Sequence, residues 1–483
     1  MYTCLDQALE HPRGLAVLNT MINLVQKLLL LSLCLVFFFP LFVGSASSQE
    51  PGAKPKLDLA AKIAREYSLG ILDEIEKILT EYYYDPKYRG LDLKKKIEEA
   101  KARVKTLQYN WQMYRVLVQL LMDFDDSHTR MLLPPRTDHF DYGFRMQMIG
   151  NSCFIISVKK DSDAYKQGVR PGDEIVALGR FTPTRRDLWK MNYVLYKLDP
   201  AKILDIKIRK TDGAEQALRL NAKTMTDKEY LAEWKAKKER RKKKEKDEPF
   251  KCVEVAIDTV ACKLYSFVVE RNDIDKMMSH ALKYPKLILD LRGNGGGYVS
   301  IEQYVLSHFF DHEVKIADLV TRTKKETRTT KPIGGRMYKG ELAVLVDSNS
   351  ASAAEMTARV LQLEKRAKIY GDYSSGSVMT SISVPFRSVM SALSDVAVIQ
   401  VGMSVTIADV VMKDGSRLEN HGVEPDEVLQ PTGLAFVQKT DAVLAYVAQK
   451  FGAVLTPEKA GSLHFLIPES DDEDDNDQAE DAE

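Results

Sequence analysis

The chain has 483 residues, a hydrophobic share of 45% and a formal net charge of zero. That length favours several domains with a sizeable core, and the neutral balance gives no reason to expect a nucleic-acid partner. The charges are segregated, however, into a basic run, Lys235–Lys246, and an acidic tail, Glu469–Glu483. We interpret both as solvated or disordered segments, and the tail, over 466–483, is expected not to fold.

The N-terminus predicts an exported protein. Lys27 precedes the apolar run Leu28–Val43, which ends at the small residues Gly44-Ser45-Ala46. This order is typical of a signal peptide, here 1–46, with Met21 as an alternative start. A periplasmic or extracellular location follows. At about 16 residues the run is short for a membrane span, but an uncleaved anchor is the alternative.

Three cysteines would remain after cleavage: Cys153, Cys252 and Cys262. Three allow at most one intramolecular disulfide, so the chain is not a disulfide scaffold. A hairpin turning at Asp258-Thr259 would keep Cys252 and Cys262 from facing each other. The sequence therefore assigns no disulfide pair.

Three segments precede the core. Residues 57–135 are predicted to form a helical cap, because apolar side chains recur at helical spacing before Pro134 and Pro135. Residues 140–223 alternate strands with turns and predict a β domain. Residues 224–250 form a charged helical insertion with little apolar face.

Residues 251–455 predict an α/β core, which makes the chain a multidomain α/β (α+β) protein. Strand Leu287–Leu291 precedes a glycine-rich turn, and strand Leu342–Val346 precedes the helix Ala353–Gln362. Such alternation indicates parallel strands, with functional groups beyond their carboxyl ends. Asn294–Gly297 and Ser350–Ser352 occupy that position. Ser352 also begins a helix, where backbone N–H groups favour an oxyanion.

Four motifs occur in order along the core: LILDLRGNGGG (Leu287–Gly297), VLVDSNSASAAE (Val344–Glu355), IYGDYSSG (Ile369–Gly376) and LENHGVEPD (Leu418–Asp426). With these motifs the core resembles the C-terminal processing (tail-specific) serine peptidases, which include the tricorn core protease and share a ClpP/crotonase-like core. Residues 140–223 resemble a PDZ domain, with Tyr142, Gly143 and Phe144 in the place of its carboxylate-binding loop.

The resemblance implies a serine endopeptidase that forms an acyl-enzyme on Ser352. Its usual lysine base is absent, because position 377 is Ser377. A hydroxyl cannot replace a neutral lysine as base. The tricorn branch instead implies His128 as base, with Ser127 and Glu419 orienting the imidazole. The substrates would be unfolded or C-terminally exposed polypeptides.

Other interpretations stay open. The oxyanion donors are expected to be the N–H groups of Gly296 and Ala353. Ser352 with Glu355 also fits a helix capping box, and His421 is a rival base. No metal or cofactor is expected. The alternative function is an inactive relative that binds peptides or other ligands.

Overall fold

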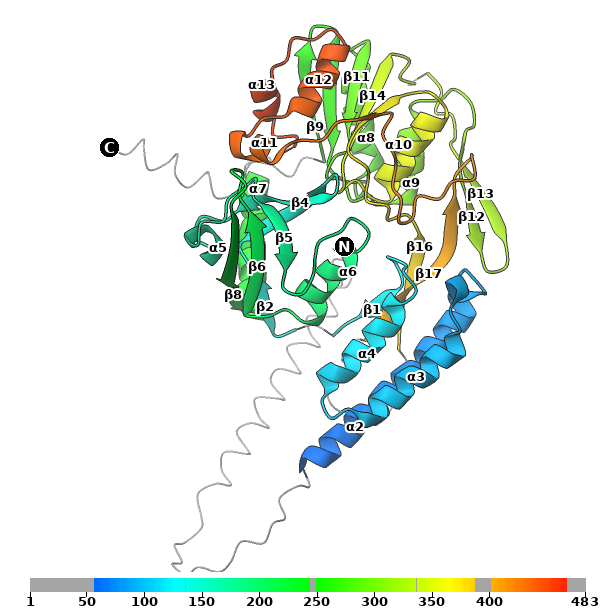
Figure 1. Cartoon of the computed structure of the whole chain (residues 1–483). Coiled ribbons are helices and arrows are strands. Elements are labelled where there is room, and N and C mark those ends of the chain that lie inside the picture. The colour runs from blue at the N-terminus through cyan, green and yellow to red at the C-terminus, as the bar shows by residue number, and fades with distance from the viewer. Residues whose placement is uncertain (1–55, 135, 244–248, 336, 387–400, 467–483) are drawn as a thin grey trace, which may run out of the picture. The chain divides into compact units, whose positions relative to one another are not determined.

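The computed structural model describes residues 56–134, 136–243, 249–335, 337–386 and 401–466 (Figure 1). The predicted signal peptide, nearly all of the acidic tail and part of the charged insertion lie outside these ranges. All features described below belong to the unit Lys56–Glu483. Within the described ranges, no helix is long and apolar enough to cross a membrane.

The core is a six-stranded sheet in the order β18-β15-β14-β11-β10-β9. Neighbouring strands are parallel, except for the antiparallel hairpin of β9 and β10. The predicted alternation of strands and crossover helices is therefore confirmed. The strands are β9 (Phe250–Ala256), β10 (Thr259–Leu264), β11 (Lys286–Asp290), β14 (Glu341–Val346), β15 (Lys368–Gly371) and β18 (Glu427–Val428).

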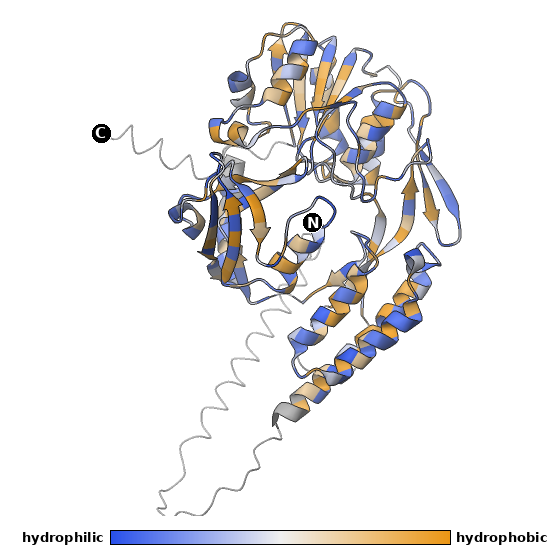
Figure 2. Ribbon diagram, viewed as in Figure 1, coloured by the Kyte–Doolittle hydropathy of each residue, from blue (hydrophilic) through white to orange (hydrophobic). Residues whose placement is uncertain are grey.

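Helices cover both faces of this sheet (Figures 1 and 2). Val344 and Val346 of β14 face one core cluster, whereas Ala343 and Leu345 face the other. Apolar side chains on both faces are typical of a parallel sheet between helical layers. One layer consists of α8 (Arg271–Ala281), α9 (Val299–Ser307) and α10 (Ala353–Leu363), and the other of α12 (Ala442–Lys450) and α13 (Pro457–Gly461).

The helical cap packs on a second sheet. Its helices α2 (Lys56–Tyr82), α3 (Leu93–Thr106) and α4 (Asn110–Met122) share a core with Met403 and Val405 of β17 (Gly402–Val411). β17 continues to Val410, which belongs to the core cluster beside α10. This strand therefore joins the cap to the core. Its neighbours are β1 (Arg130–Leu132), β12 (Lys315–Thr321) and β16 (Thr380–Pro385), and β13 (Lys325–Thr329) pairs with β12.

Residues 144–221 form a separate five-stranded antiparallel sheet in the order β3-β4-β5-β6-β7. A short ribbon, β2 (Asp138–Asp141) and β8 (Lys223–Thr226), leads into and out of it, and the charged helix α7 (Asp227–Lys243) follows. The elements of the sheet region are β3 (Phe144–Ile149), β4 (Ser152–Val158), α5 (Asp163–Lys166), β5 (Glu174–Leu178), α6 (Leu188–Tyr193), β6 (Ile203–Arg209) and β7 (Glu215–Asn221).

The hairpin of β9 and β10 differs from the predicted one. Thr259 pairs with Ala256, and a bulge then shifts the register so that Cys262 faces Cys252. These two cysteines form a disulfide, and Cys153 is free and buried. The predicted register was wrong for two reasons. The turn lies at Ile257-Asp258 rather than Asp258-Thr259, and the bulge adds one residue to one strand, which realigns every later pair.

Candidate active site

Ser352 lies at the turn between β14 and α10. It precedes the first residue of the helix and has a φ of 54°, which a non-glycine residue rarely adopts. No side-chain hydrogen bond from Ser352 caps the helix, although Ser352 and Glu355 occupy the two capping-box positions. Such strained positions cluster at functional sites. The turn presents a hydroxyl group at the N-terminus of a buried helix.

Glu355 holds this turn against the segment Ser374–Ser377. Its buried carboxylate accepts hydrogen bonds from the N–H groups of Ser352 (2.9 Å), Gly376 (2.7 Å) and Ser377 (3.0 Å), and from the Ser374 hydroxyl (2.6 Å). Burial raises its pKa to about 7, although these donors oppose the shift. Glu355 therefore fixes the place of Ser352 and of the residue at the family's lysine position.

The glycine-rich turn after β11 approaches Ser352 closely. A Cβ atom on Gly296 would lie 2.7 Å from the Ser352 Cβ and 2.8 Å from the Ala351 carbonyl oxygen. The Gly296 N–H, one of the two expected oxyanion donors, donates to the Asn294 side chain at 2.9 Å. The other, the Ala353 N–H, has no hydrogen-bond partner among the described residues. In this state Ala353 alone of the two is available to an oxyanion.

His128 lies on the turn between α4 and β1. Its ring Nδ1 is 2.8 Å from the Ser127 hydroxyl, and its backbone N–H donates to the Asp126 carboxylate at 3.0 Å. Burial lowers the pKa of His128 below its ordinary value, although the charge of Asp126 opposes this. A lowered pKa keeps the imidazole neutral near pH 7, and a neutral imidazole is the form that accepts a proton.

Ser377 links the histidine turn to the serine turn. Its carbonyl oxygen accepts the Ser352 N–H at 3.1 Å, and its hydroxyl lies 3.1 Å from the Ser127 hydroxyl. A series of short contacts therefore runs from the Ser352 backbone through Ser377 and Ser127 to His128. No hydrogen bond joins the Ser352 hydroxyl to His128 in the part of the chain that the structure describes. Catalytic hydrogen bonds often tighten only when substrate is bound.

Glu419 reaches this group from the segment before β18. Its carboxylate accepts hydrogen bonds from the N–H groups of Ser127 (3.1 Å) and Val378 (2.8 Å), and among the described residues it has no hydrogen bond to the imidazole ring of His128. Burial raises its pKa to about 7, and the nearby charge of Asp126 adds to the shift. Glu419 therefore contacts His128 through Ser127.

Asp126 is a residue that the sequence analysis did not select. It is fully buried and accepts hydrogen bonds from Thr406 (2.9 Å) and Thr129 (2.9 Å) as well as His128. Its position directly before Ser127 and His128 in the chain was the available signal. Single ligand atoms of Asp126, His128 and Glu419 lie within 4.8 Å of one another, as in a metal site. Both carboxylates already accept hydrogen bonds, which accounts for the cluster without an ion.

The rival base His421 points elsewhere. Its Nδ1 contacts the Glu419 carbonyl oxygen at 2.8 Å, and the residue is exposed. In the described residues it shares no hydrogen bond with Ser352 or Ser377. The structure therefore gives His128, and not His421, a hydrogen-bonded connection to the serine turn.

The Tyr142–Phe144 loop is folded inward. The Tyr142 hydroxyl donates to the Ala201 carbonyl at 3.0 Å, and both aromatic rings are buried. The Gly143 N–H donates to the Asp141 carboxylate at 2.8 Å, which in turn pairs with Lys159 at 2.6 Å. A peptide carboxylate would need that N–H, so in this state the predicted binding position is occupied by an internal carboxylate.

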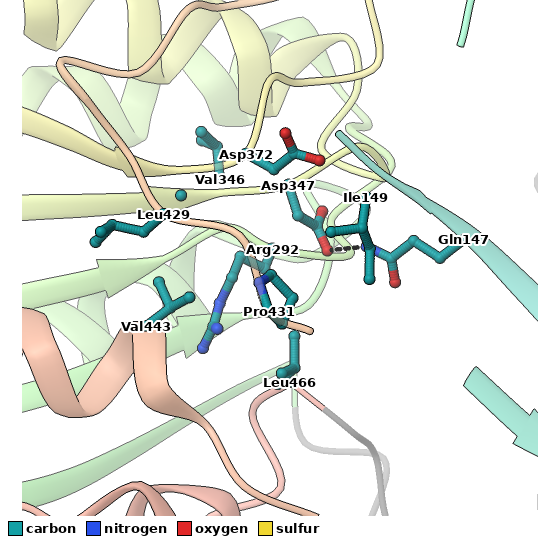
Figure 3. A pocket seen from close by; sticks show the side chains of 11 residues that line it. Gln147, Ile149, Arg292, Val346, Asp347, Asp372, Leu429, Pro431, Val443 and Leu466 are labelled. Atoms are coloured by element: carbon teal, nitrogen blue, oxygen red, sulfur yellow. Dashed lines mark hydrogen bonds between the residues drawn. The ribbon is translucent and has the colours of Figure 1, made fainter. Parts of the chain in front are cut away.

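A small cavity lies at the carboxyl edge of β14 and β15, between Asp347, Asp372, Arg292 and Gln147 (Figure 3). Gln147 donates to Asp347 at 2.8 Å across it. Its volume of about 10 Å³ suits about one water molecule. A peptide side chain does not fit there.

Part of the core matches a known protein family. Residues 259–429 match Peptidase family S41. The match covers part of the core, and the predicted resemblance to the C-terminal processing peptidases is confirmed.

Two curated relatives have matching names. The carboxy-terminal processing protease CtpB of Bacillus subtilis (strain 168) is 23% identical over 287 residues, which are 59% of this chain and 54% of the relative. The tail-specific protease of Haemophilus influenzae is 25% identical over 324 residues, 60% of this chain and 44% of the relative. The chain thus spans about half the length of the curated relatives it matches.

Solved structures support the fold. Mature CPAF complexed with lactacystin aligns with a TM-score of 0.60 and 13% identity, covering 84% of this chain and 100% of that one. A second structure of mature CPAF gives a TM-score of 0.59 with 14% identity, over 83% and 96% of the two chains. At these identities the likeness concerns the fold alone, and it confirms the predicted α/β multidomain class.

Proposed function

We propose that this protein is an exported serine endopeptidase that cleaves unfolded or C-terminally exposed polypeptides. The single observation that carries the proposal is the connected group Ser352–Ser377–Ser127–His128, with Glu419 bound to Ser127. The contacts between an imidazole from the cap segment and the backbone of a serine at a helix N-terminus support a serine–histidine mechanism. The family match and the names of the relatives support the same class.

In the proposed mechanism, the Ser352 hydroxyl oxygen attacks the scissile carbonyl carbon and its proton passes to Nε2 of His128. Nδ1 is the nitrogen that contacts Ser127, so Nε2 is left to act as the base. The oxyanion of the tetrahedral intermediate accepts the Ala353 N–H. Collapse of the intermediate returns the proton to the leaving amine and leaves an acyl-enzyme on Ser352, which a water molecule then hydrolyses.

Glu419 and Asp126 place negative charge near the imidazolium that forms during this transfer. Glu419 acts through Ser127, and Asp126 holds the His128 backbone. Both are positioning groups. Because the pKa of Glu419 is raised to about 7, its full charge is present only above that pH.

A fluorophosphonate probe tests the proposal, because it reacts only with an activated serine. We expect the full chain to be labelled at Ser352, and labelling to fall by about 10³-fold in His128→Ala. His421→Ala is the matched control and should be labelled like the wild type. Unlabelled wild type that also leaves reduced casein intact would instead support the peptide-binding alternative.

A further inference from the structure

Four large apolar side chains are exposed at one end of the helical cap. Leu59 and Ile63 lie in the first turns of α2, and Tyr109 and Trp111 lie where α4 begins. Their exposed fractions are between 48% and 60%. We call these four residues the cap tip. Large apolar side chains that gather on a surface often mark an interaction site, whereas single scattered ones do not.

Contacts between the cap helices bring the two halves of the cap tip together. The Arg65 guanidinium donates to the Leu107 carbonyl at 3.2 Å, and the Ser68 hydroxyl contacts the Met113 sulfur at 3.5 Å. Successive residues of α2 therefore meet successive residues of the segment that enters α4, so the two helices run in the same direction. The start of α2 and the α3–α4 turn lie at the same end of the cap (Figure 1).

The aromatic part of the cap tip has a defined geometry. The rings of Tyr109 and Trp111 stack with their centroids 6.3 Å apart, and the Arg115 guanidinium lies 4.5 Å from the centroid of the Trp111 ring. Arg115 is itself paired with Asp199 at 2.8 Å. A side chain that is already held in one place loses little conformational entropy when it binds a partner. Trp111 is thus exposed and oriented at once.

Basic side chains lie around the cap tip. The last turn of α3, directly before the turn into α4, carries Arg103 and Lys105. Both of these side chains are exposed, as is Lys62 next to Ile63. Over residues 59–66 and 103–111 the sequence has one acidic residue, Glu66, and four basic residues: Lys62, Arg65, Arg103 and Lys105. Apolar and aromatic side chains next to exposed cations are typical of a surface that lies in the interface of an anionic bilayer.

We propose that the cap tip binds the surface of an anionic lipid bilayer. Trp and Tyr rings favour the headgroup level, where one edge of the ring is apolar and the other is hydrated. The chain before α2 favours the same partner. The apolar run Leu28–Val43 is separated from α2 by residues 44–55, which span at most about 40 Å. A membrane that holds this run therefore has the cap tip within reach.

A second copy of the chain is the rival occupant of this surface. A symmetric dimer brings the same patch of both copies together. The exposed cations Lys62, Arg103 and Lys105 of one copy would then face their equivalents in the other, and like charges across an interface are unfavourable. Anionic headgroups instead complement these cations. The charge of the rim therefore favours lipid over a second copy.

The proposal has a consequence for the orientation of the molecule. α2 has 27 residues and is therefore about 40 Å long. Just after its far end, the Tyr84 N–H donates to the Thr406 carbonyl at 3.1 Å, and the Thr406 hydroxyl donates to Asp126 beside His128. A bilayer at the cap tip would leave the candidate active site in the aqueous phase at the opposite end of α2. The inference does not depend on the proposed peptidase function.

Quenching of tryptophan fluorescence by brominated lipid tests the inference. The full chain has three tryptophans, so Trp189→Phe/Trp234→Phe leaves Trp111 as the reporter. The matched control, Trp111→Phe/Trp234→Phe, leaves Trp189, which is half-buried on α6. Both variants are bound to vesicles of brominated phosphatidylcholine with phosphatidylglycerol. We expect the lipid to quench Trp111 about twofold, since a tryptophan at headgroup level meets the acyl chains, and to leave Trp189 unchanged.

Two aliphatic substitutions in the Trp111 reporter examine the rest of the cap tip. Leu59→Ser/Ile63→Ser should remove most of the quenching, because the apolar area that enters the bilayer is lost. Ile257→Ser/Val454→Ser is the matched control, since these side chains are 92% and 93% exposed and lie outside the cap. Its quenching should equal that of the unmodified reporter.

Two charge substitutions separate lipid charge from apolar contact. Arg103→Gln/Lys105→Gln should weaken the contact, because each basic side chain near an anionic surface strengthens binding by about fivefold. Vesicles of phosphatidylcholine alone should likewise quench Trp111 less than anionic ones. If the aliphatic variant does not fold, as judged by its thermal unfolding, this charge variant carries the test.

The possible failures are distinct. Unquenched Trp111 in a chain that floats with the vesicles overturns the inference, because the N-terminal run alone would then hold the chain. A chain that does not float with the vesicles overturns it as well. Unquenched Trp111 together with a lipid-free dimer that Trp111→Ser disrupts would assign the cap tip to a second copy. Fluorophosphonate labelling of Ser352 is a separate measurement, so the peptidase proposal stands or falls independently.

Discussion

The molecule has two loops that sequence motifs single out as anion-binding positions, and the structure treats them differently. In the serine turn, the Ala353 N–H has no partner among the described residues. In the Tyr142–Phe144 loop, the Gly143 N–H is bound to Asp141, whose charge is balanced by Lys159. A motif therefore predicts where backbone donors gather, but a neighbouring side chain decides whether they are available.

The two expected oxyanion donors at the serine turn also differ from each other. The Gly296 N–H already donates to Asn294, whereas the Gly296 backbone touches Ser352. In this state Gly296 matters because its backbone lies close to Ser352, whereas its N–H is already bound. Substitutions in each of the two loops distinguish these roles.

Gly296→Ala should have the largest effect. Gly296 has a φ of 89°, and a Cβ would lie 2.7 Å from the Ser352 Cβ, so the serine turn must move. We expect casein cleavage to fall by about 10²–10³-fold, the cost of disturbing an oxyanion site. Gly295→Ala is the control, because its Cβ would meet no atom within 4 Å. Equal activity of the two variants would show that the close contact does not matter.

Glu419→Gln should change the pH dependence of activity. Activity of the wild type should rise with pH through about 7, because Glu419 ionises there and then stabilises the imidazolium. Removing this charge should lower the rate by about 10–100-fold and abolish the rise near pH 7. What remains is the rise set by deprotonation of His128, whose pKa is lowered by burial. Glu302→Gln is the matched control: burial raises its pKa to about 7 as well, but Arg328 is its charged neighbour.

The same pair of variants predicts a stability effect with a definite sign. Glu419 and Glu302 have pKa values near 7 in the folded protein and about 4.3 when unfolded. The folded state thus retains protons that the unfolded state has lost, so the free energy of unfolding falls as pH rises from about 4.3 to 7. Either glutamine variant should show a weaker fall in thermal-unfolding measurements. An unchanged slope would mean that these carboxyls are not protonated in the folded state.

Much of the fold could be predicted from local patterns. Val344 and Val346 alternate with Ala343 and Leu345 along one apolar run, which indicates a strand buried on both faces. The helical spacing of apolar residues in the cap predicts its helices in the same way. The register of the β9–β10 hairpin could not be predicted. The position of the turn and the one-residue bulge together bring Cys252 opposite Cys262, and local sequence patterns specify neither.

Sequence motifs select the residues of the candidate site but not the contacts between them. The motifs select Ser352, Ser127, His128 and Glu419, whereas Ser377 provides the link to the serine turn and Asp126 binds the His128 backbone N–H. These contacts join positions such as Asp126 and Thr406 that lie far apart in the chain. Only the packing of β17 against the cap brings them within reach, so spacing along the sequence carries no signal for them.

Ser377→Ala tests whether the link between the two turns matters. The substitution removes the hydroxyl that contacts Ser127 but keeps the carbonyl that accepts the Ser352 N–H. A neutral hydrogen bond contributes about 1 kcal/mol, so kcat/KM should fall about fivefold. Ser383→Ala, at an exposed position of β16, should leave kcat/KM unchanged. A loss as large as that of His128→Ala would instead assign Ser377 a direct part in proton transfer.

Asp141→Ala, beside the Tyr142–Phe144 loop, should have the smallest effect. The substitution frees the Gly143 N–H and leaves the positive charge of Lys159 beside it. If this loop binds a substrate's C-terminus, affinity for a fluorescent peptide with a free carboxylate should increase about threefold, as measured by anisotropy. The same peptide with an amidated C-terminus is the control. If both peptides bind wild type and variant with equal affinity, freeing the Gly143 N–H has no effect on carboxylate binding. The loop would then have a structural role only.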